Sequence, residues 1–448
     1  MLTADDVIDL TMPFYEGMPT DDLGPKVWER MGYAYARQLQ GGTQTRAGRL
    51  VLTTDHTGTH IDGPLRFNPQ GMPIEQVPLE RFLASARLLD LRSLGRTGTI
   101  DVPALMRASA GDLQPGEAAV LWTGHDRHIA DPGYFWRRPE LGRDAAEFLA
   151  SRRPALVAAD FPGLGRPGDD RFEVKRILHK AGILTMEQLR NLEALEGRIW
   201  HLYGAPLRIR GGAGSIIRAC GLVNWRARGI VDLTLDLHGA MPSLGAIPQF
   251  WTRANHELTA FFSAQEVSYQ TNAMMLNEHA GTHLDAPSHF DEDGLAIDDL
   301  RLSDLVARAR MFDMRHKGPL EAIGAADLEA QVGRAGFEPG DAAVIWTGHC
   351  RNYDRADYGY HRPFITADGA DWIVERKASV LVTDLVGLDE HADLTSPVHN
   401  KILLAGICML QVTTNLGALA DGGWEICAFP LKFVRGTGAP LRAFAARI

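Results

Sequence analysis

The sequence predicts a mixed α/β protein made of two tandem copies of one domain, for two reasons. The first is an internal repeat: GEAAVLWTGH at 116–125 matches GDAAVIWTGH at 340–349, and the closing segments of the two copies are also alike. The second is that short β-branched and apolar runs, typical of strands, alternate with helix-like windows in each copy. We therefore predict one domain at 1–224 and a second at 225–448, packed as an intramolecular pseudo-dimer.

Each predicted copy opens with a strand and continues with the same series of elements. VIDLT at 7–11 and IVDLT at 230–234 are rich in β-branched residues, which favour strands. AAVLWTG at 118–124 and ALVAAD at 155–160 are further expected strands of the first copy. DAAEFLASRR at 144–153 is an expected helix, because its basic end suits the negative end of a helix dipole. This alternation indicates a mixed α/β domain.

The composition excludes several classes of protein. The chain has 448 residues, of which 45% are hydrophobic and 23% charged, which are ordinary values for a globular protein. Its net charge of −10, without any block of Lys and Arg, argues against a nucleic-acid partner. The longest apolar runs, such as ILLAGICML at 402–410, are far too short to span a bilayer. We expect no membrane partner and a small-molecule substrate.

The N-terminal stretch and the cysteines indicate the compartment. MLTADDVIDL has neither the basic region nor the apolar core of a signal peptide. The four cysteines have no paired spacing, so we expect no disulfide framework. We therefore expect a cytoplasmic protein, and further homo-oligomerisation of the chain is left open.

A histidine cluster in the second copy has the composition of a metal site. EHAGTHLDAPSHFD at 278–291 contains His279, His283 and Asp285 in an H-x3-H-x-D arrangement. Two imidazoles and a carboxylate are typical ligands of Zn, Mn or Fe(II). Gly281 and a following proline favour a loop or strand end over a helix. The cluster recurs 223 residues earlier, which favours a shared chemical role over isolated surface histidines.

The motif HAGTHLDAPSHF resembles the H-x-G-T-H-x-D-x-P-x-H-F signature of the cyclase family of metal-dependent hydrolases, which includes bacterial kynurenine formamidase and isatin hydrolase. The resemblance extends through both copies, so it implies two domains of the kynurenine formamidase type. It also implies that His279, His283 and Asp285 bind metal. By the same resemblance, His289 is the catalytic acid/base.

The resemblance adds two later ligand positions. His399 occupies the position of a later family histidine, and Gln411, twelve residues on, replaces the family's glutamate. Both are expected in the metal-ligand set. Because the amide removes one negative charge, we expect a single divalent ion, Mn or Zn, per chain, held by the second copy; the isatin hydrolase branch is similar in using a single Mn.

The first copy carries a degenerate version of this site in DHTGTHIDGPLRFN at 55–68. Two cationic side chains stand where the family has neutral histidines, and their charge opposes metal binding. We expect Arg66 to form a salt bridge with Asp62 or Glu187 and to hold an inactive site rigid; an anion-binding or regulatory pocket is the alternative. The predicted members of this degenerate site are His56, His60, Asp62, Arg66, Lys175 and Glu187.

These residues predict a metal-dependent hydrolase or cyclase. A divalent ion activates water and polarises a carbonyl, and His289 can take up and return a proton near neutral pH. The expected reaction is hydrolysis of an amide, lactam or ester of a small aromatic substrate. A polyketide-type aldol or dehydrative ring closure is the alternative, and a non-catalytic scaffold is a third interpretation. Trp251 and Phe290 are expected to bind the substrate, although Trp251 also suits a core position.

Overall fold

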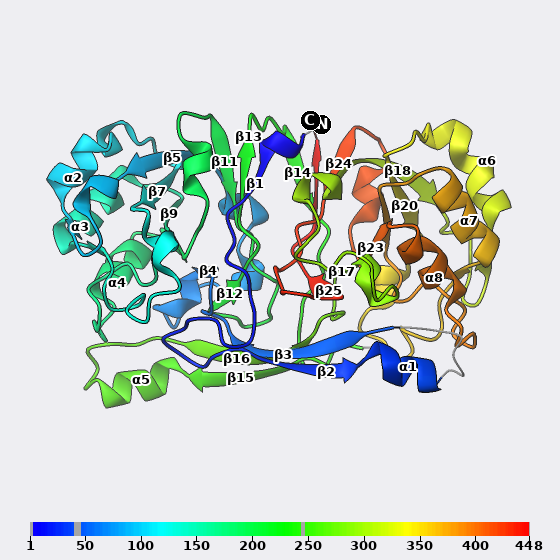
Figure 1. The fold of residues 1–448 in the computed structure, drawn as a ribbon, viewed down its shortest axis with the longest axis horizontal. Helices are drawn as coiled ribbons and strands as arrows, with labels where there is room; N and C mark the ends of the chain where they lie inside the picture. The colour runs from blue at the N-terminus through cyan, green and yellow to red at the C-terminus, as the bar shows by residue number, and fades with distance from the viewer. Residues whose placement is uncertain (1–2, 40–45, 243–246, 448) are drawn as a thin grey trace.

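The computed structural model describes residues 3–39, 46–242 and 247–447, whose strands form two nine-stranded sheets, one four-stranded sheet and two two-stranded sheets. Figure 1 shows the two large sheets side by side, with helices at both outer ends and the four-stranded sheet along one edge. Each large sheet is built from one copy of the repeat, so the predicted pair of mixed α/β domains is confirmed. Within the described ranges, no helix is long and apolar enough to cross a membrane.

The sheet of the first copy has a parallel centre and antiparallel edges. In spatial order its strands are β1 (Val7–Asp9), β13 (Cys220–Val223), β11 (Trp200–Tyr203), β5 (Leu83–Asp90), β7 (Ala118–Trp122), β9 (Leu156–Ala159), β10 (Leu184–Glu187), β4 (His60–Asp62) and β12 (Gly214–Ile216). The run from β5 to β10 is parallel, and the strands outside it pair antiparallel. The central strands are wholly apolar, as expected of strands buried on both faces.

The sheet of the second copy repeats this order strand for strand. Its strands are β14 (Gly229–Asp232), β26 (Phe444–Arg447), β24 (Trp424–Cys427), β18 (Val306–Asp313), β20 (Ala342–Trp346), β22 (Val380–Thr383), β23 (Cys408–Gln411), β17 (His283–Asp285) and β25 (Gly438–Pro440). The strands expected in VIDLT, IVDLT, AAVLWTG and ALVAAD are therefore confirmed as β1, β14, β7 and β9. The two-stranded sheets pair β6 (Thr99–Ile100) with β8 (Glu140–Leu141) and β19 (Ala322–Ile323) with β21 (Phe364–Ile365).

Helices cover the outer face of each large sheet. In the first copy they are α2 (Val102–Arg107), α3 (Arg143–Arg152) and α4 (Glu173–Lys180), and in the second copy α6 (Ala325–Ala335), α7 (Ala367–Glu375) and α8 (Pro397–Leu404). The remaining two helices, α1 (Tyr33–Leu39) and α5 (His256–Phe262), lie at the two ends of the four-stranded sheet (Figure 1). The helix expected in DAAEFLASRR is α3, which ends where Arg153 adopts a left-handed conformation. Side-chain caps fix other helix starts; the Asp101 carboxylate accepts the Ala104 N–H at the start of α2.

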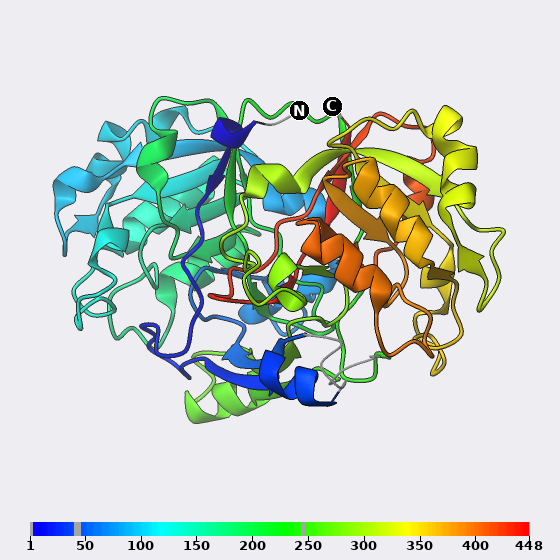
Figure 2. The same cartoon turned by 45° about the vertical axis from the view of Figure 1, so that its right-hand side comes forward.

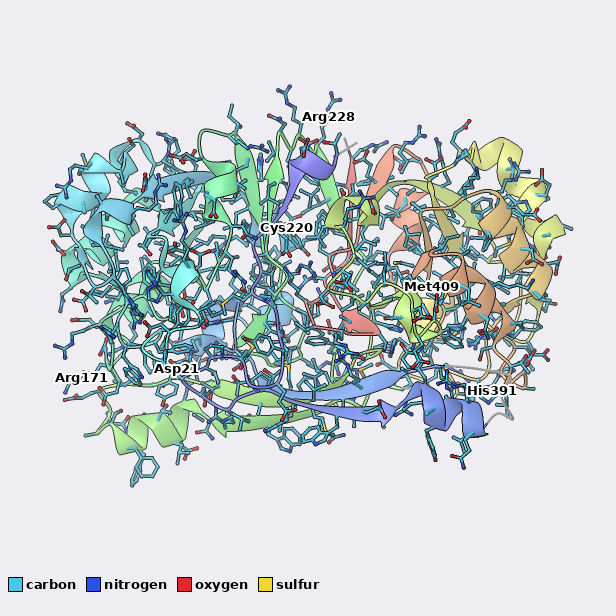
Figure 3. All side chains as sticks on the ribbon, in the orientation of Figure 1. Asp21, Arg171, Cys220, Arg228, His391 and Met409 are labelled. Carbon is cyan, nitrogen blue, oxygen red and sulfur yellow. The ribbon has the colours of Figure 1, made fainter. Side chains whose placement is uncertain are left out.

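The alternation of side chains along each central strand divides the protein into three cores. Ala119 and Leu121 of β7 face α2, α3 and α4, whereas Ala118 and Val120 face the middle of the molecule. The matching strand β20 behaves in the same way, so the inner faces of both sheets share one continuous central core. Figure 3 places Cys220 in this middle region. The division of the chain at 1–224 and 225–448 stays a prediction.

The four-stranded sheet is formed by arms that the two copies exchange. The first-copy arm contains β2 (Lys26–Met31) and β3 (Gly48–Thr54), and the second-copy arm contains β15 (Gln249–Ala254) and β16 (Thr271–Asn277). The strand order of the sheet is β15-β16-β3-β2. In the pairing of β3 with β16, Leu52 lies opposite Met275, its own equivalent in the repeat. The pairing is therefore symmetric about this point, as at a two-fold interface. Figures 1 and 2 show α1 under the second copy and α5 under the first.

A symmetric set of ion pairs joins the copies above this sheet. Asp9 accepts from Arg218 Nε at 3.0 Å and from Lys432 Nζ of the other copy at 2.6 Å. Arg218 also donates to Pro430 O at 2.9 Å. Arg442 repeats these contacts with Asp232 and Pro206. Because both halves of the network cross between the copies, neither copy presents a separate surface there.

Candidate metal centre and catalytic site

Three ligand-type side chains of the second copy converge inside the large sheet. β17 lies between β23 and β25, and the two-residue alternation along a strand turns His283 and Asp285 to one face. The preceding turn brings His279 beside them. His279 Nδ1 is 2.6 Å and His283 Nε2 3.3 Å from Asp285 Oδ1. The structure therefore brings the three predicted first ligands to one point.

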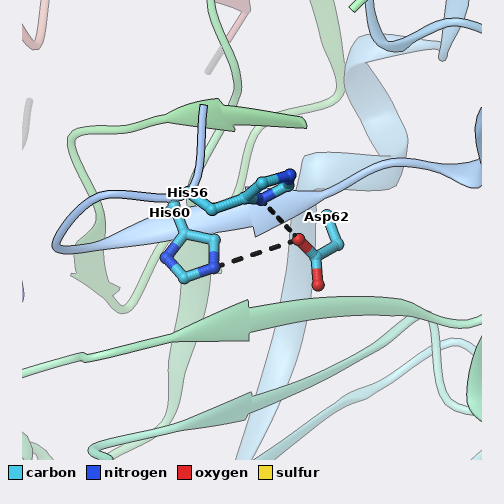
Figure 4. Close-up of side chains that lie close together, drawn as sticks. All are labelled: His56, His60 and Asp62. Atoms are coloured by element: carbon cyan, nitrogen blue, oxygen red, sulfur yellow. Dashed lines mark ion pairs between the residues drawn. The ribbon is translucent and has the colours of Figure 1, made fainter. Parts of the chain in front are cut away.

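The first copy keeps the same triad, which Figure 4 shows in close-up. His56 Nδ1 lies 2.8 Å and His60 Nε2 3.9 Å from Asp62 Oδ1. Both ring nitrogens of His56 and the Oδ1 of Asp62 are buried and lack an aligned hydrogen-bond partner among the described residues. The ligand-type atoms of this triad lie as close together as those of the second copy, which is the arrangement of a divalent-cation site.

A backbone carbonyl orients one histidine in each triad. His283 Nδ1 is 2.8 Å from Gly281 O, and His60 Nδ1 is 2.8 Å from Gly58 O. A carbonyl oxygen only accepts, so Nδ1 carries the proton and Nε2 keeps its lone pair for a metal. Gly281 has φ +60°, and a Cβ there would lie 2.5 Å from Leu237 Cδ2, so glycine is required at this turn.

In both copies a nitrogen donor holds the outer oxygen of the aspartate. Gln411 Nε2 donates to Asp285 Oδ2 at 2.5 Å, while Gln411 Oε1 accepts the Gly387 N–H at 2.8 Å. In the first copy, Lys175 Nζ donates to Asp62 Oδ2 at 2.9 Å. Gln411 stays a predicted ligand, but coordination through its oxygen would require a half-turn of the amide. In the present arrangement it directs nitrogen toward the aspartate.

Lys175 acts as a resident cation of the first-copy site. Its Nζ also lies 2.7 Å from Glu187 Oε1. Burial alone would raise the pKa of Asp62, but the charge of Lys175, together with His56 and His60, outweighs burial and holds that pKa well below its ordinary value. The pKa of Glu187 is lowered for the same reasons. Burial opposes the charge of Lys175, yet the two carboxylates raise its pKa, so all three groups are charged at neutral pH.

The salt bridge expected of Arg66 is wrong. Lys175 takes the two carboxylates, and no ion pair of Arg66 is present in the described part of the chain. The guanidinium turns away, donates to Gln270 O of the other copy at 2.6 Å and lies among three aromatic rings, which favour a cation over their faces. These rings belong to Phe67, Phe172 and Tyr269, with centroids 5.2, 5.4 and 5.1 Å from the guanidinium carbon.

His289 lies directly against the second-copy triad. Its ring stacks on His279 with centroids 3.9 Å apart, and its Nδ1 is 2.5 Å from Ala47 O. Burial and the neighbouring His279 hold the pKa of His289 well below its ordinary value, so the imidazole is neutral. Since Ala47 O can only accept, the proton is on Nδ1 and Nε2 is the basic nitrogen. Ala47 belongs to the arm of the first copy.

Asp389 is a site residue that sequence reasoning missed. Its carboxylate pairs with His399 Nδ1, which directs His399 Nε2 toward Asp285 Oδ2, 4.0 Å away. The surrounding segment GLDEHADL has the composition of a solvated loop, so only the position of Asp389 ten residues before His399 hints at a role. The ring of Phe290 stacks on that of His399 with centroids 5.3 Å apart, and Phe290 is 3% exposed.

The two expected substrate contacts do not line the second-copy cavity. Phe290 packs behind the histidines in the core next to α8 rather than at the cavity wall. Trp251 is 47% exposed on β15, in the arm that crosses toward the first copy. The exchange of arms is the physical reason, because it carries Trp251 away from the histidines that follow it in sequence. Both expectations are corrected accordingly.

The cavity at the second-copy triad measures ≈ 170 Å³ and is built from both copies. His279, His283 and Asp285 form part of it, and Arg30 and Arg46 reach it from the first-copy arm. The first-copy cavity is larger, at ≈ 570 Å³, and is likewise completed by the second-copy arm. Figure 3 places Asp21, which lines this larger cavity, near one end of the four-stranded sheet.

Comparison with known proteins identifies the family. The sequence model of the family described as "Putative cyclase" matches residues 8–166 and again 231–390. The chain is 29% identical over 177 residues to a kynurenine formamidase of Bacillus cereus, covering 39% of this chain and 79% of that protein. A kynurenine formamidase of Bacillus cytotoxicus is 27% identical over 179 residues, covering 40% and 81%. The solved isatin hydrolase A from Ralstonia solanacearum is 24% identical, with a TM-score of 0.44, over 49% of this chain and 91% of that one.

The two matches of the family model fall on equivalent parts of the two copies and together cover most of the chain. Each contains one of the His-His-Asp triads. The chain therefore belongs to the cyclase family and is an enzyme of that family, with its domain present twice.

Proposed function

We propose that the second copy is a metal-dependent hydrolytic centre for an amide, lactam or ester carbonyl of a small aromatic substrate. The observation that carries the proposal is the convergence of His279, His283 and Asp285 on one point, with the neutral ring of His289 stacked beside them. The relatives named kynurenine formamidase support hydrolysis of this kind of bond. We infer one divalent ion, Mn or Zn, in this copy, with His399 as the further predicted ligand.

The side chains define how such a centre would move protons. When bound, a divalent ion would supply Lewis-acid activation of water and of the substrate carbonyl. His289 Nε2 would accept a proton from the attacking water and return it to the leaving nitrogen or oxygen. Ala47 O keeps the His289 ring in this orientation by accepting its Nδ1–H. Asp285 is held in place from its other side by Gln411.

Ring closure is the second candidate reaction, and the description of the family as a cyclase favours it. The same Nε2 of His289 would then remove a proton from the carbon next to the activated carbonyl. The non-catalytic scaffold interpretation is not retained, because the chain belongs to an enzyme family. A cytoplasmic location and a small-molecule substrate stay predictions.

The test is turnover of isatin and of N-formylkynurenine by protein loaded with Mn or Zn. We expect hydrolysis of at least one compound, with loss of activity on removal of metal by a chelator. His289→Ala should keep the metal and lose about 10²- to 10⁴-fold in rate. His361→Ala, at an exposed histidine, is the matched control and should retain full activity. Normal turnover by His289→Ala would refute the role of that residue, and a cyclised product would favour the second candidate.

A further inference from the structure

Two arginines of the first-copy arm line the cavity at the second-copy triad without a carboxylate partner. Arg30 lies in β2, and Arg46 lies two residues before the start of β3. Neither forms an ion pair within the described residues, and residues 40–45, which precede Arg46 in the sequence, include no acidic residue. Burial and the charge of Arg30 lower the pKa of the Arg46 guanidinium. The pair therefore carries a like-charge repulsion that no described protein group relieves.

The backbone aims Arg30 into the cavity by means of a β-bulge. Glu29 pairs with Arg49 and Met31 with Gly48, so Arg30 is the extra residue between these pairs. A bulge bends the strand and redirects one side chain, and bulges are frequent beside active sites. The bulge therefore presents the unpaired guanidinium at the cavity.

The other arm provides an internal comparison. It has the same bulge, with Arg253 as the extra residue, and Arg253 lines the first-copy cavity. There the charge is neutralised, because Arg253 pairs with Asp22. The equivalent of Asp22 in the second copy is Gly245, and the equivalent of Arg46 in the other arm is Tyr269. The first-copy cavity thus has one arginine, Arg253, which is paired with a carboxylate, whereas the second-copy cavity has two arginines without one.

The remaining wall of the second-copy cavity suits an aromatic anion. Among its described lining residues, Asp285 is the single carboxylate, and it belongs to the metal triad. Tyr353 and Tyr358 also line the cavity, but their hydroxyls donate to backbone carbonyls, so only the rings are available for contact with a ligand. Two guanidinium groups and a predicted divalent ion give this cavity an excess of positive charge, which a substrate anion would balance.

We propose that Arg30 and Arg46 bind a carboxylate of the substrate, so that the enzyme selects small aromatic carbonyl compounds that carry a carboxylate. The planar fork of a guanidinium matches a carboxylate in two parallel hydrogen bonds. The assignment deepens the proposed function and rests on it for the reacting carbonyl. It also gives the first copy a role in the second site: its arm supplies the specificity-determining groups.

The first test compares two substrates that differ only in charge. The probes are 2-formamidobenzoate and the neutral 2-formamidobenzamide, assayed with metal-loaded protein. Arg30→Gln and Arg46→Gln should each lower kcat/KM for the carboxylate probe by about tenfold to a hundredfold, chiefly through KM. The same variants should change kcat/KM for the neutral probe less than about threefold. Arg253→Gln, the matched control in the other arm, should change neither.

The outcomes of this test separate the possible roles. Equal losses for both probes would overturn the proposal, because the arginines would then support the fold rather than bind charge. Unchanged kcat/KM for the carboxylate probe in both variants would also overturn it. Turnover of the neutral probe alone would leave the proposed hydrolysis standing while refuting carboxylate recognition.

A binding measurement distinguishes failure of the proposal from failure of the proposed function. Binding of fluorescent 2-aminobenzoate to the metal-loaded protein needs no turnover, and 2-aminobenzamide is its neutral control. Arginine-dependent binding of the carboxylate without any hydrolysis would support the proposal and refute the hydrolytic function. Binding that is unaffected by both substitutions, as when the carboxylate coordinates the metal, would overturn the proposal. Stronger displacement by phenyl phosphate than by benzoate would overturn the choice of carboxylate.

Discussion

Lys175 Nζ lies 2.9 Å from Asp62 Oδ2, beside the buried first-copy triad and at the position that His399 holds in the second copy. The ammonium also reaches Glu187, so one fixed cation satisfies two buried carboxylates. The first copy therefore carries inside its own chain a charge that a metal ion could otherwise provide. This relationship leads to a set of predictions that separate the two copies.

Replacing Lys175 should lower the free energy of unfolding, because two buried carboxylates would lose their counter-charge. Lys175→Met leaves Asp62 and Glu187 without their cation, and we expect a loss of about 3–5 kcal/mol in the free energy of unfolding at neutral pH. In the parent protein the pKa of both carboxyls is lowered, so their stabilising contribution is complete above their unfolded values and is lost as pH falls through the folded values. Urea unfolding near neutral pH measures the loss.

The pH dependence of this variant has a definite sign. Without Lys175, burial raises the pKa of the two carboxyls. As pH falls from about 7.5 to about 5 they become protonated, which removes the buried negative charge that destabilises the variant. The stability gap to the parent protein should therefore narrow on acidification. Lys180→Met makes the same change at an exposed position of the same helix and should cost little at either pH. A gap that stays constant with pH would contradict the assignment.

Metal content should distinguish the two triads. We expect about one Mn or Zn per chain by elemental analysis, lost in His283→Ala and retained in His60→Ala, because cationic Lys175 opposes an ion in the first copy. Loss of metal in both variants would show that the first triad is also occupied. No metal in the parent protein after reconstitution would contradict the proposed function itself.

Gln411 should limit the second copy to a single ion. Gln411→Glu replaces the donor to Asp285 Oδ2 with a carboxylate and should allow a second ion between Asp285 and His399. Metal titration with calorimetric detection would measure the stoichiometry. Gln411→Met also removes the donor but adds no charge, so it should stay at one ion. A single ion in both variants would show that a group other than Gln411 limits how many metal ions the second copy binds.

The contact between Arg49 and Glu278 should link the arm to the metal triad. Glu278 is fully buried, pairs with Arg49 of the other copy at 2.6 Å, and accepts from Thr437 Oγ1, which lies 3.1 Å from His279 Nε2. Arg49→Met should therefore cost about 3–5 kcal/mol in stability and weaken metal binding. Lys26→Met breaks the exposed pair with Glu16, which solvent screens, and should leave both stability and metal binding essentially unchanged. Unchanged metal affinity in Arg49→Met would refute the link.

Much of the fold follows from local sequence patterns. AAVLW forms β7 because an unbroken run of small and branched apolar residues suits a strand buried on both faces. The ligand cluster was predictable for a similar reason, since Gly281 and the His-x-Asp spacing of β17 bring the side chains together locally. Such features depend on residues that are neighbours in the chain.

The remainder depends on contacts that spacing cannot reveal. Arg66 and Lys175 look equivalent as cations, and only the packing of α4 decides that Lys175 reaches Asp62. The exchange of arms is equally invisible, because a repeat has the same periodicity whether β3 pairs within its copy or across to β16. For this reason the sequence predicts a substrate contact for Trp251, which does not line the second-copy cavity, and gives no sign of Arg30, which does.

The symmetric pairing of β3 with β16 also changes how the two cavities can diverge. In a dimer of identical chains, one substitution in an arm alters both cavities at once, so neither can specialise without the other. Fusion into one chain removes that constraint. Arg46 and Tyr269 can then differ at equivalent positions, and each arm can be tuned by mutation for the cavity that it completes. The covalent link thus allows the two sites of this enzyme to change independently, whereas in a symmetric dimer they would stay identical.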